Sequence, residues 1–454
     1  MNRPLSATVL AAALALPAMS QAANHYVRAD ATGNGSGSDW TNASRTLPTR
    51  LVRGDTYYLG AGNYGAHTFD DADNGTQAIS IVRATATNHG TDTGWKSTYN
   101  TGTATFTQWT VLTDWYVFDG QRRNADWATG ATDQYGLRVS GTGPVMLDDW
   151  LGHGSNHVTF RYVDIVGGGR DNPAADDAIW GAVGNSWMTW QYCAIHDSGR
   201  TLFFMRGNWQ NMVVDHTYMA RNTSNANSHG ELLSMNSSTH VVWSNNWMED
   251  IEGTGFLVGI SNGTAADWDV FGNVALHTAK YFADSGSRPE HSWGVAAFIY
   301  VAHDDLQTNF GNDWRVHDNT FVDLKGVWSG VHIEAGTGNV VRNNVWYAAY
   351  DAGQLLGTGG TIDHNWYYQT PHAADTSPTT VTCTTNCAIF VNHDAHDFHL
   401  VRALGGAQTL PAPATVDMDG VTRGINGAWD VGAYQFRGTA LSKQAAPRYL
   451  QGAN

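Results

Sequence analysis

The chain has 454 residues, a formal net charge of −16 and only 15% charged residues. A protein this acidic gains no electrostatic attraction to nucleic acid or to an anionic membrane, so neither is an expected partner. Its 50 glycines and 11% aromatic residues favour β-structure with tight corners and disfavour a helical protein.

The first residues have the pattern of an export signal. Arg3 supplies a basic start, residues 8–19 are apolar, and Ser20 to Ala23 offer small residues for cleavage. An apolar run this short cannot span a bilayer, which takes about 20 residues. We therefore predict a signal peptide over residues 1–23 and a secreted or periplasmic mature protein with no membrane span.

The cysteines fit an oxidising compartment. Cys383 and Cys387 bracket a short polar segment and can close a very small disulfide loop there. Cys193 lies in an alternating strand pattern and is most simply a buried thiol. Their spacing predicts no zinc site.

From residue 156 onward, similar strand-like segments recur. Their centres are Val158, Met188, Val213, Val242, Val270, Val316, Val341 and Ile362. Most spacings are roughly 21 to 30 residues, with one of roughly 46, which is typical of the turns of a parallel β-helix. Leucine-rich repeats need a consensus that is absent here, and propeller blades need a longer unit. Asparagines recur at the corners, where they suit left-handed backbone and side-chain ladders: Asn245, Asn246, Asn319, Asn343, Asn344 and Asn365.

A second set of strands lies between these repeats, often with glycine at the entrance. Its members are 178–181, 201–204, 230–233, 255–258, 295–299, 330–334 and 353–356. Stacked in parallel, they would form one long sheet with alternate side chains facing outward. Residues 66–150 contain the strand patterns 79–82 and 115–120, and we do not assign the rest of that region to turns.

The two ends of the mature chain carry recognisable motifs. Tyr26-Val27, a glycine-rich loop over 33–39 and a Gly54-Asp55-Thr56 turn ending in Gly62-Asn63-Tyr64 open it, and residues 417–434 close it. This arrangement resembles secreted bacterial right-handed parallel β-helix proteins of the pectate-lyase-like superfamily, in architecture rather than in one enzyme family. The resemblance implies an all-β solenoid with short polar corners and looped-out insertions. We expect a single domain over 24–437, with an N-terminal cap (24–65), a terminating segment (397–437) and a loose tail (438–454).

The resemblance also implies that a polysaccharide lies along one outward sheet face, for which the second set of strands is the candidate. Val331 and Ile333 would face inward, which places His332 and Glu334 outward. Acidic residues within apolar strands need a reason, so Glu231 and Glu334 lead the catalytic candidates. The other candidate catalytic residues are Asp176, Asp177, His229 and His332. The candidate substrate-binding residues are Arg200, Arg206, Trp180, Trp293, His303 and Asp304.

Glycoside hydrolysis needs two carboxyl groups about 5 to 9.5 Å apart. Parallel strands lie about 4.8 Å apart, so carboxylates one or two turns apart satisfy this condition. We therefore predict a monomeric glycoside hydrolase that needs no cofactor, using Glu231 with Asp176 or Asp177, or with Glu334.

Two other functions stay open. A polysaccharide lyase would neutralise a uronate carboxylate with Ca²⁺, Arg200, Arg206 or Lys280, and would use His229 or His332 as the base. A carbohydrate-binding protein or adhesin would have no convergent carboxylate pair. Glu249, Asp250 and Glu252 are candidate Ca²⁺ ligands, although a polar corner is the simpler interpretation of them.

Overall fold

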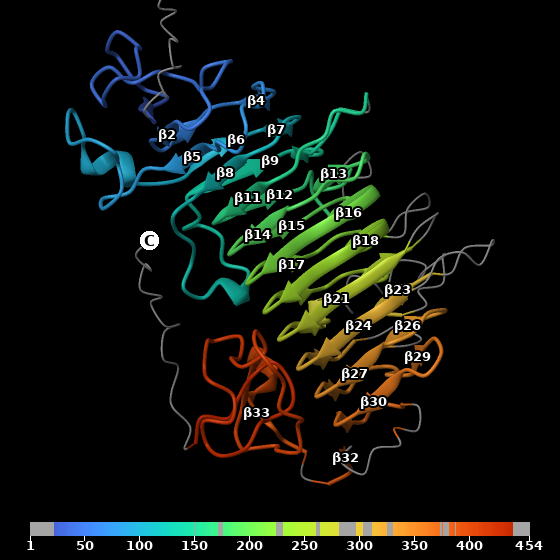
Figure 1. The fold of residues 1–454 in the computed structure, drawn as a ribbon. Coiled ribbons are helices and arrows are strands. Elements are labelled where there is room, and N and C mark those ends of the chain that lie inside the picture. The colour runs from blue at the N-terminus through green and yellow to red at the C-terminus, as the bar shows by residue number, and fades with distance from the viewer. Residues whose placement is uncertain are drawn as a thin grey trace, which may run out of the picture.

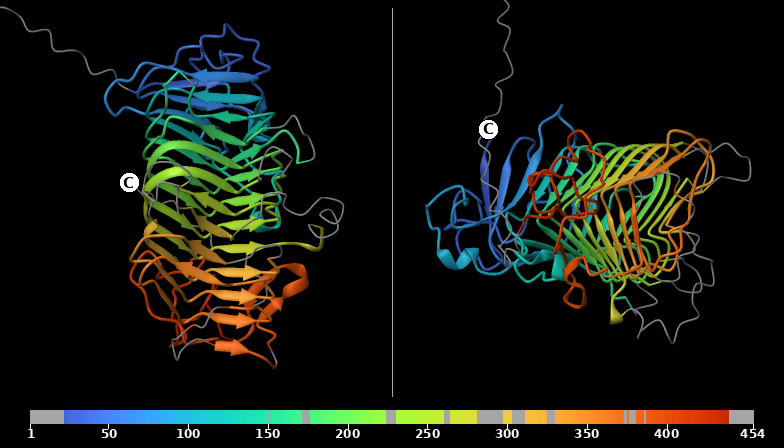
Figure 2. Two further views of the ribbon diagram at one scale, coloured as in Figure 1. Left: turned by 90° about the vertical axis from the view of Figure 1, so that its right-hand side faces the viewer. Right: turned by 90° about the horizontal axis from the view of Figure 1, so that it is seen from below.

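The computed structural model describes residues 22–149, 151–170, 176–223, 230–259, 264–280, 297–302, 311–324, 330–372, 375, 381–385 and 387–438. Within these ranges most regular elements are short β-strands that pair in parallel with the strand one turn of chain later. Figure 1 shows the turns stacked along one axis, and Figure 2 shows the same stack from two further directions. The predicted parallel coil is therefore confirmed.

Each turn supplies strands to three faces, and face A contains the first set of repeats. Its strands are β1 (Asn24–Val27), β2 (Thr56–Leu59), β5 (Ile79–Arg83), β8 (Tyr116–Asp119), β11 (Val158–Arg161), β14 (Thr189–Gln191), β21 (Ala265–Phe271), β24 (Gly311–His317), β27 (Val340–Arg342) and β30 (Thr361–Asp363), with the C-terminal halves of β16 (Phe203–Asp215) and β18 (Leu233–Ser244).

Face B contains the second set of strands. These are β4 (Ala66–Phe69), β7 (Gln108–Val111), β10 (Val145–Met146), β13 (Ile179–Gly181), the N-terminal halves of β16 and β18, β20 (Phe256–Val258), β23 (Ile299–Val301), β26 (Val331–Ile333) and β29 (Gln354–Leu356). Because β16 and β18 continue through the corner between faces A and B, the two faces join into one 20-stranded sheet within the described ranges.

Face C is a separate 12-stranded sheet in the same ranges. Its strands are β3 (Gly62–Asn63), β6 (Ala104–Phe106), β9 (Leu137–Ser140), β12 (Val163–Val166), β15 (Ala194–His196), β17 (Tyr218–Ala220), β19 (Trp247–Glu249), β22 (Val274–Leu276), β25 (Thr320–Val322), β28 (Val345–Tyr347), β31 (Trp366–Tyr368) and β32 (Val381–Cys383). Short 3-10 turns lie outside the coil at η1 (Ser97–Asn100), η2 (Trp127–Thr129) and η3 (His393–Ala395).

Alternate side chains of the three faces fill one continuous core. Large rings stack there from turn to turn, as Trp268 does on Trp314 with centroids 4.3 Å apart. Trp243 and Trp346 are fully buried, as expected of scaffold residues. The predicted strand centres needed two one-residue corrections, because Val213 pairs with Thr189 rather than Met188, and Val242 with Asp269 rather than Val270.

The corners between faces A and C combine left-handed backbone with a ladder of asparagines. Asn245 and Asn343 adopt φ values of 54° and 55°, and the residue after each lies directly before the next strand of face C. Those following residues form the ladder Asn246, Asn273, Asn319, Asn344 and Asn365, which are all buried. Each of the first four donates its backbone N–H to the Oδ1 atom of the next, at 2.9 to 3.0 Å. Both parts of the corner prediction are thus confirmed.

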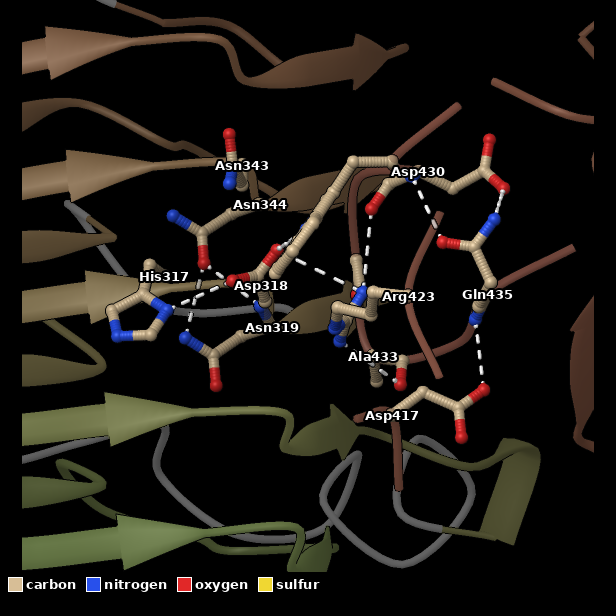
Figure 3. Close-up of polar contacts among 12 residues, drawn as sticks. His317, Asp318, Asn319, Asn343, Asn344, Asp417, Arg423, Asp430, Ala433 and Gln435 are labelled. Carbon is tan, nitrogen blue, oxygen red and sulfur yellow. Dashed lines mark hydrogen bonds and ion pairs between the residues drawn. The ribbon is translucent and has the colours of Figure 1, made fainter. Parts of the chain in front are cut away.

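The C-terminal segment, residues 387–438, turns back over face C. β33 (Phe390–Asn392) and β34 (Asp397–Leu400) form an antiparallel pair, and Phe398 stacks on Trp247 of face C. Arg423 donates to the carbonyl oxygens of Asp430 and Gly432, so the closing motif holds this segment together. Figure 3 shows Arg423 beside Asp430. This segment covers part of the outward side of face C, which therefore does not offer a continuous substrate surface.

The predictions of a Cys383–Cys387 disulfide and a buried Cys193 thiol are confirmed. Cys383 and Cys387 form a disulfide, and Cys193 is a free, buried thiol. Burial raises the pKa of the Cys193 thiol to about 12, so it stays protonated and inert at neutral pH.

Replacing Asn319 with alanine should destabilise the coil. Its side chain donates to the carbonyl of Val270 and accepts the backbone N–H of Asn273, and alanine leaves both buried groups without these partners. At 1–3 kcal/mol for each buried unsatisfied group, we expect the free energy of unfolding to fall by about 3 kcal/mol in urea titrations. The control is Asn74→Ala, because Asn74 is exposed and its side-chain partner Gln77 is exposed too. Equal effects of the two variants would contradict a stabilising ladder.

Candidate functional site

Two predicted carboxyl groups meet at the corner where the chain enters face B. Ile179 of β13, Phe203 of β16 and Leu233 of β18 are aligned in successive turns. Asp177, Thr201 and Glu231 each lie two residues before one of these aligned residues. The Thr201 N–H donates to Asp177 Oδ1 at 3.1 Å, and its hydroxyl donates to Glu231 Oε2 at 3.2 Å. One threonine therefore connects both carboxyls.

This geometry corrects the prediction that Glu231 and Glu334 lie inside apolar strands. β18 begins at Leu233, so Glu231 belongs to the corner, and Glu334 follows the last residue of β26. Asp177 and Glu231 are only 1% and 3% exposed. The Glu231 side chain is buried at the corner instead of projecting from a strand, and Thr201 links it to Asp177 two turns away.

Two arginines complete what we call the arginine–carboxyl cluster (Asp176, Asp177, Arg200, Arg206 and Glu231). Arg200 Nη1 lies 3.3 Å from Asp176 Oδ1 and 3.4 Å from Asp177 Oδ2. The guanidinium groups of Arg200 and Arg206 lie 4.5 and 4.6 Å from the centre of the Phe204 ring. Such cation–π contacts stabilise charge on an outward sheet face.

Arg206 is less fully neutralised than Arg200. Its Nη1 donates to the neutral Oδ1 atom of Asn236 at 3.1 Å. Burial lowers the pKa of Arg206, and the charge of Arg200 lowers it further, whereas Glu231 and Asp177 act in the opposite direction. Arginine stays protonated, so the incompletely neutralised charge of Arg206 favours binding of an additional polar or anionic group.

Asp177 has the most altered acidity in the cluster. Burial raises the pKa of its carboxyl to about 8, although Arg200 acts in the opposite direction. Asp176 adds to the increase by charge repulsion. Asp177 is therefore protonated at neutral pH and can donate a proton there.

A second group, the Tyr300 cluster (Tyr300, His332 and Glu334), lies farther along face B. The Tyr300 hydroxyl donates to Glu334 Oε1 at 2.5 Å, and its ring meets the His332 ring edge-on at 5.3 Å. Burial lowers the pKa of His332, while Glu334 acts in the opposite direction. His332 is therefore a neutral imidazole at neutral pH, and Val331 and Ile333 on either side of it point into the core.

The two clusters are too far apart to act on one bond. Trp180, Phe204, Ser234, Leu257, Tyr300 and His332 are aligned in one outward column. Phe204 and Tyr300 are three strand spacings apart, or roughly 14 Å. Glu231 and Glu334 are likewise separated by three turns, which exceeds the reach of a carboxyl pair. Their proposed pairing was therefore wrong.

The remaining predicted residues divide into two groups. Trp180 lies in the outward column and is 7% exposed. His229, Trp293, His303 and Asp304 lie outside the described residues. Thr201, Phe204 and Tyr300 were missed, because their roles depend on alignment between turns; aligning the second set of strands residue by residue would have found them.

The proposed Ca²⁺ ligands take part in ordinary corner contacts. Glu249 accepts a hydrogen bond from Trp247, and both oxygens of Asp250 accept hydrogen bonds from Thr278. In the described ranges, no group of three or more His, Cys, Asp or Glu side chains is arranged to hold a metal ion. Among those same residues, no helix has the length and hydropathy needed to cross a membrane.

Comparison with solved structures identifies the architecture. The pectate lyase Pel9A matches with a TM-score of 0.52 at 15% identity, covering 92% of this chain and 98% of that one. The fold is a right-handed parallel β-helix of the pectate-lyase-like type. The DFA-IIIase of Arthrobacter chlorophenolicus A6 gives a TM-score of 0.38 at 12% identity over 80% of this chain and 97% of that one. No family model and no curated protein matches this chain.

Replacing Asp177 with asparagine should alter the pH dependence of stability. Between its ordinary pKa of 3.8 and the folded value of about 8, the folded carboxyl keeps a proton that the unfolded chain loses. Rising pH over this interval therefore favours unfolding of the wild type, and Asp177→Asn removes this contribution. We expect the urea midpoint of the variant to rise relative to the wild type as pH increases from about 4 to 8.

Asp30→Asn is the control, because the Asp30 side chain is 76% exposed and takes no part in the arginine–carboxyl cluster. Its difference from the wild type should change little with pH. Parallel behaviour of the two variants would show that burial does not control the acidity of Asp177.

Proposed function

We propose that this protein is a secreted or periplasmic enzyme that degrades a polysaccharide lying along the outward side of face B, and that it acts by hydrolysis. The observation that supports this proposal is the Asp177–Thr201–Glu231 connection. Asp177 is protonated up to about pH 8 and serves as the general acid, and Glu231 serves as the base. The fold shared with the pectate lyase Pel9A adds support for a carbohydrate substrate.

The spacing of the two carboxyls favours inversion of the anomeric centre. Asp177 and Glu231 are two turns apart, or roughly 9.6 Å between equivalent backbone positions, which is close to the upper limit for inverting glycosidases. Because both side chains are nearly inaccessible, productive binding requires Arg200 to move away from Asp177. A substrate oxygen that binds Arg200 would compete with Asp177 for the guanidinium and so open the site.

Elimination is the second candidate reaction. It is favoured by Arg206, which can neutralise a uronate carboxylate, and by His332, whose lowered pKa suits a base. The wide separation of these two residues along face B weighs against their acting on one sugar unit, so hydrolysis is the preferred reaction.

The decisive experiment is incubation of the purified protein with a panel of neutral and uronate-containing polysaccharides. New reducing ends without ultraviolet absorbance would support hydrolysis. New absorbance from an unsaturated uronate would replace hydrolysis with elimination. Absence of product from every glycan would favour a non-catalytic binding protein or adhesin.

Asp177→Asn and Glu231→Gln should each lower turnover by about 100-fold or more, the usual contribution of a general acid or base. Turnover of the wild type should fall as pH rises through about 8, because the acid loses its proton. The matched control is Glu249→Gln, since burial also raises the pKa of Glu249 but that residue lies on face C. Unchanged turnover of Asp177→Asn, with folding intact by circular dichroism, would exclude this residue as the acid.

A further inference from the structure

A column of aromatic side chains lies on the corner between faces B and A. Trp115, His157 and Trp187 occupy equivalent positions in successive turns, each just before an aligned position of face A. The Trp115 and His157 rings stack with centroids 3.8 Å apart, and the His157 and Trp187 rings with centroids 5.7 Å apart. Their planes are inclined by only 3° and 7°. The rings therefore form an ordered stack along the coil axis.

The stack ends in an open indole face. The next position in the column is Asn211, whose short side chain cannot continue the stacking. Trp187 is 54% exposed, the most exposed tryptophan among the described residues, and its ring stacks on His157. A flat apolar surface therefore faces the space above Asn211.

The backbone conformation at these positions is energetically unfavourable for tryptophan. Trp115 and Trp187 adopt φ values of 62° and 59°, a left-handed conformation that costs an ordinary residue about 1–2 kcal/mol. Farther along the column the same conformation is adopted by Asn211, Asp267 and Asp313, two residue types that tolerate it well. The same left-handed backbone recurs at other corners of the coil, such as Tyr162 and Tyr192, so it does not explain the choice of tryptophan. Because Trp187 is exposed, core packing does not explain it either.

We propose that the open face of Trp187 is a carbohydrate-binding subsite that holds one pyranose ring of a glycan. The C–H face of a pyranose packs on an indole ring, while its hydroxyls reach the rim. Asn211 supplies a donor and an acceptor there, and His240 lies two turns from Trp187, at roughly 9.6 Å. That spacing accommodates one sugar ring in stacking contact with Trp187. The net charge of −16 disfavours a nucleic-acid base as the occupant.

This subsite is separate from the arginine–carboxyl cluster. Trp187 belongs to the same turn as Asp177 but lies beyond the other end of β13. A glycan bound there would be retained at the edge of face B without contact with either carboxyl. The subsite therefore does not depend on which reaction, if any, the cluster performs.

The test is affinity electrophoresis of the full chain in native gels that contain laminarin, hydroxyethyl cellulose, xylan or polygalacturonate. At least one polysaccharide should slow the wild type. Trp187→Ala should weaken that retardation by about tenfold, and Trp187→Phe should keep part of it because a ring remains. Tyr350→Ala is the matched control, since Tyr350 is 59% exposed on another corner and its removal should leave retardation unchanged.

Three outcomes would overturn the subsite. The first is that no polysaccharide slows the wild type, and the second is that Trp187→Ala is slowed as much as the wild type. The third is that sedimentation shows a wild-type dimer that Trp187→Ala turns into a monomer, because Trp187 would then hold two copies of the chain together. Asp177→Asn should be slowed like the wild type while losing turnover. Loss of turnover alone therefore tests the proposed reaction, and loss of retardation alone tests the subsite.

Discussion

Parallel pairing between successive turns is the constraint on which this structure depends. Each strand must align with the strand one turn earlier, and a slip of one residue would move every inward side chain to the outside. The buried asparagine ladder opposes such slips, because Asn273, Asn319 and Asn344 each bond to both neighbouring turns. Buried amide groups that lose their partners are costly, so the ladder fixes the alignment of all three faces.

Alignment also turns residues distant in sequence into neighbours in space. Asp177 and Glu231 meet through Thr201 because all three hold the same place in their turns. The same rule places Trp115, His157 and Trp187 in one stack. Both proposed sites are thus columns of the coil, one buried beneath arginines and one open to solvent. Their different exposure suits one to proton transfer and the other to retention of a sugar.

The faces differ in what covers them, and this difference limits where a long substrate can lie. Face C is partly covered by the C-terminal segment, which Figure 3 shows anchored through Arg423 and Asp318 near the corner of β24 and β25. His317 is clamped there between Asp269 and Asp318, whose hydrogen bonds raise its pKa despite burial. The closing motif that the sequence displays therefore attaches this segment to the coil.

The repeat period and the corner asparagines were sufficient to predict the coil and to separate the strands of faces A and B. They left the alignment uncertain by one residue at β16 and β18. There Met212 and Val213, and again Val241 and Val242, are apolar in succession, so hydrophobicity alone does not indicate which member faces inward.

The sequence by itself determined the fold class, the turn period and which residue types lie at corners, because each of these properties is local and repeats. Only the tertiary structure decided which carboxyls share a site and which aromatic rings stay exposed. Contacts between turns depend on the combined lengths of all the intervening corners and insertions, and no short stretch of sequence encodes that sum. Glu231 therefore belongs with Asp177 and not with Glu334, and Phe204 lies beneath two arginines while Trp187 remains open.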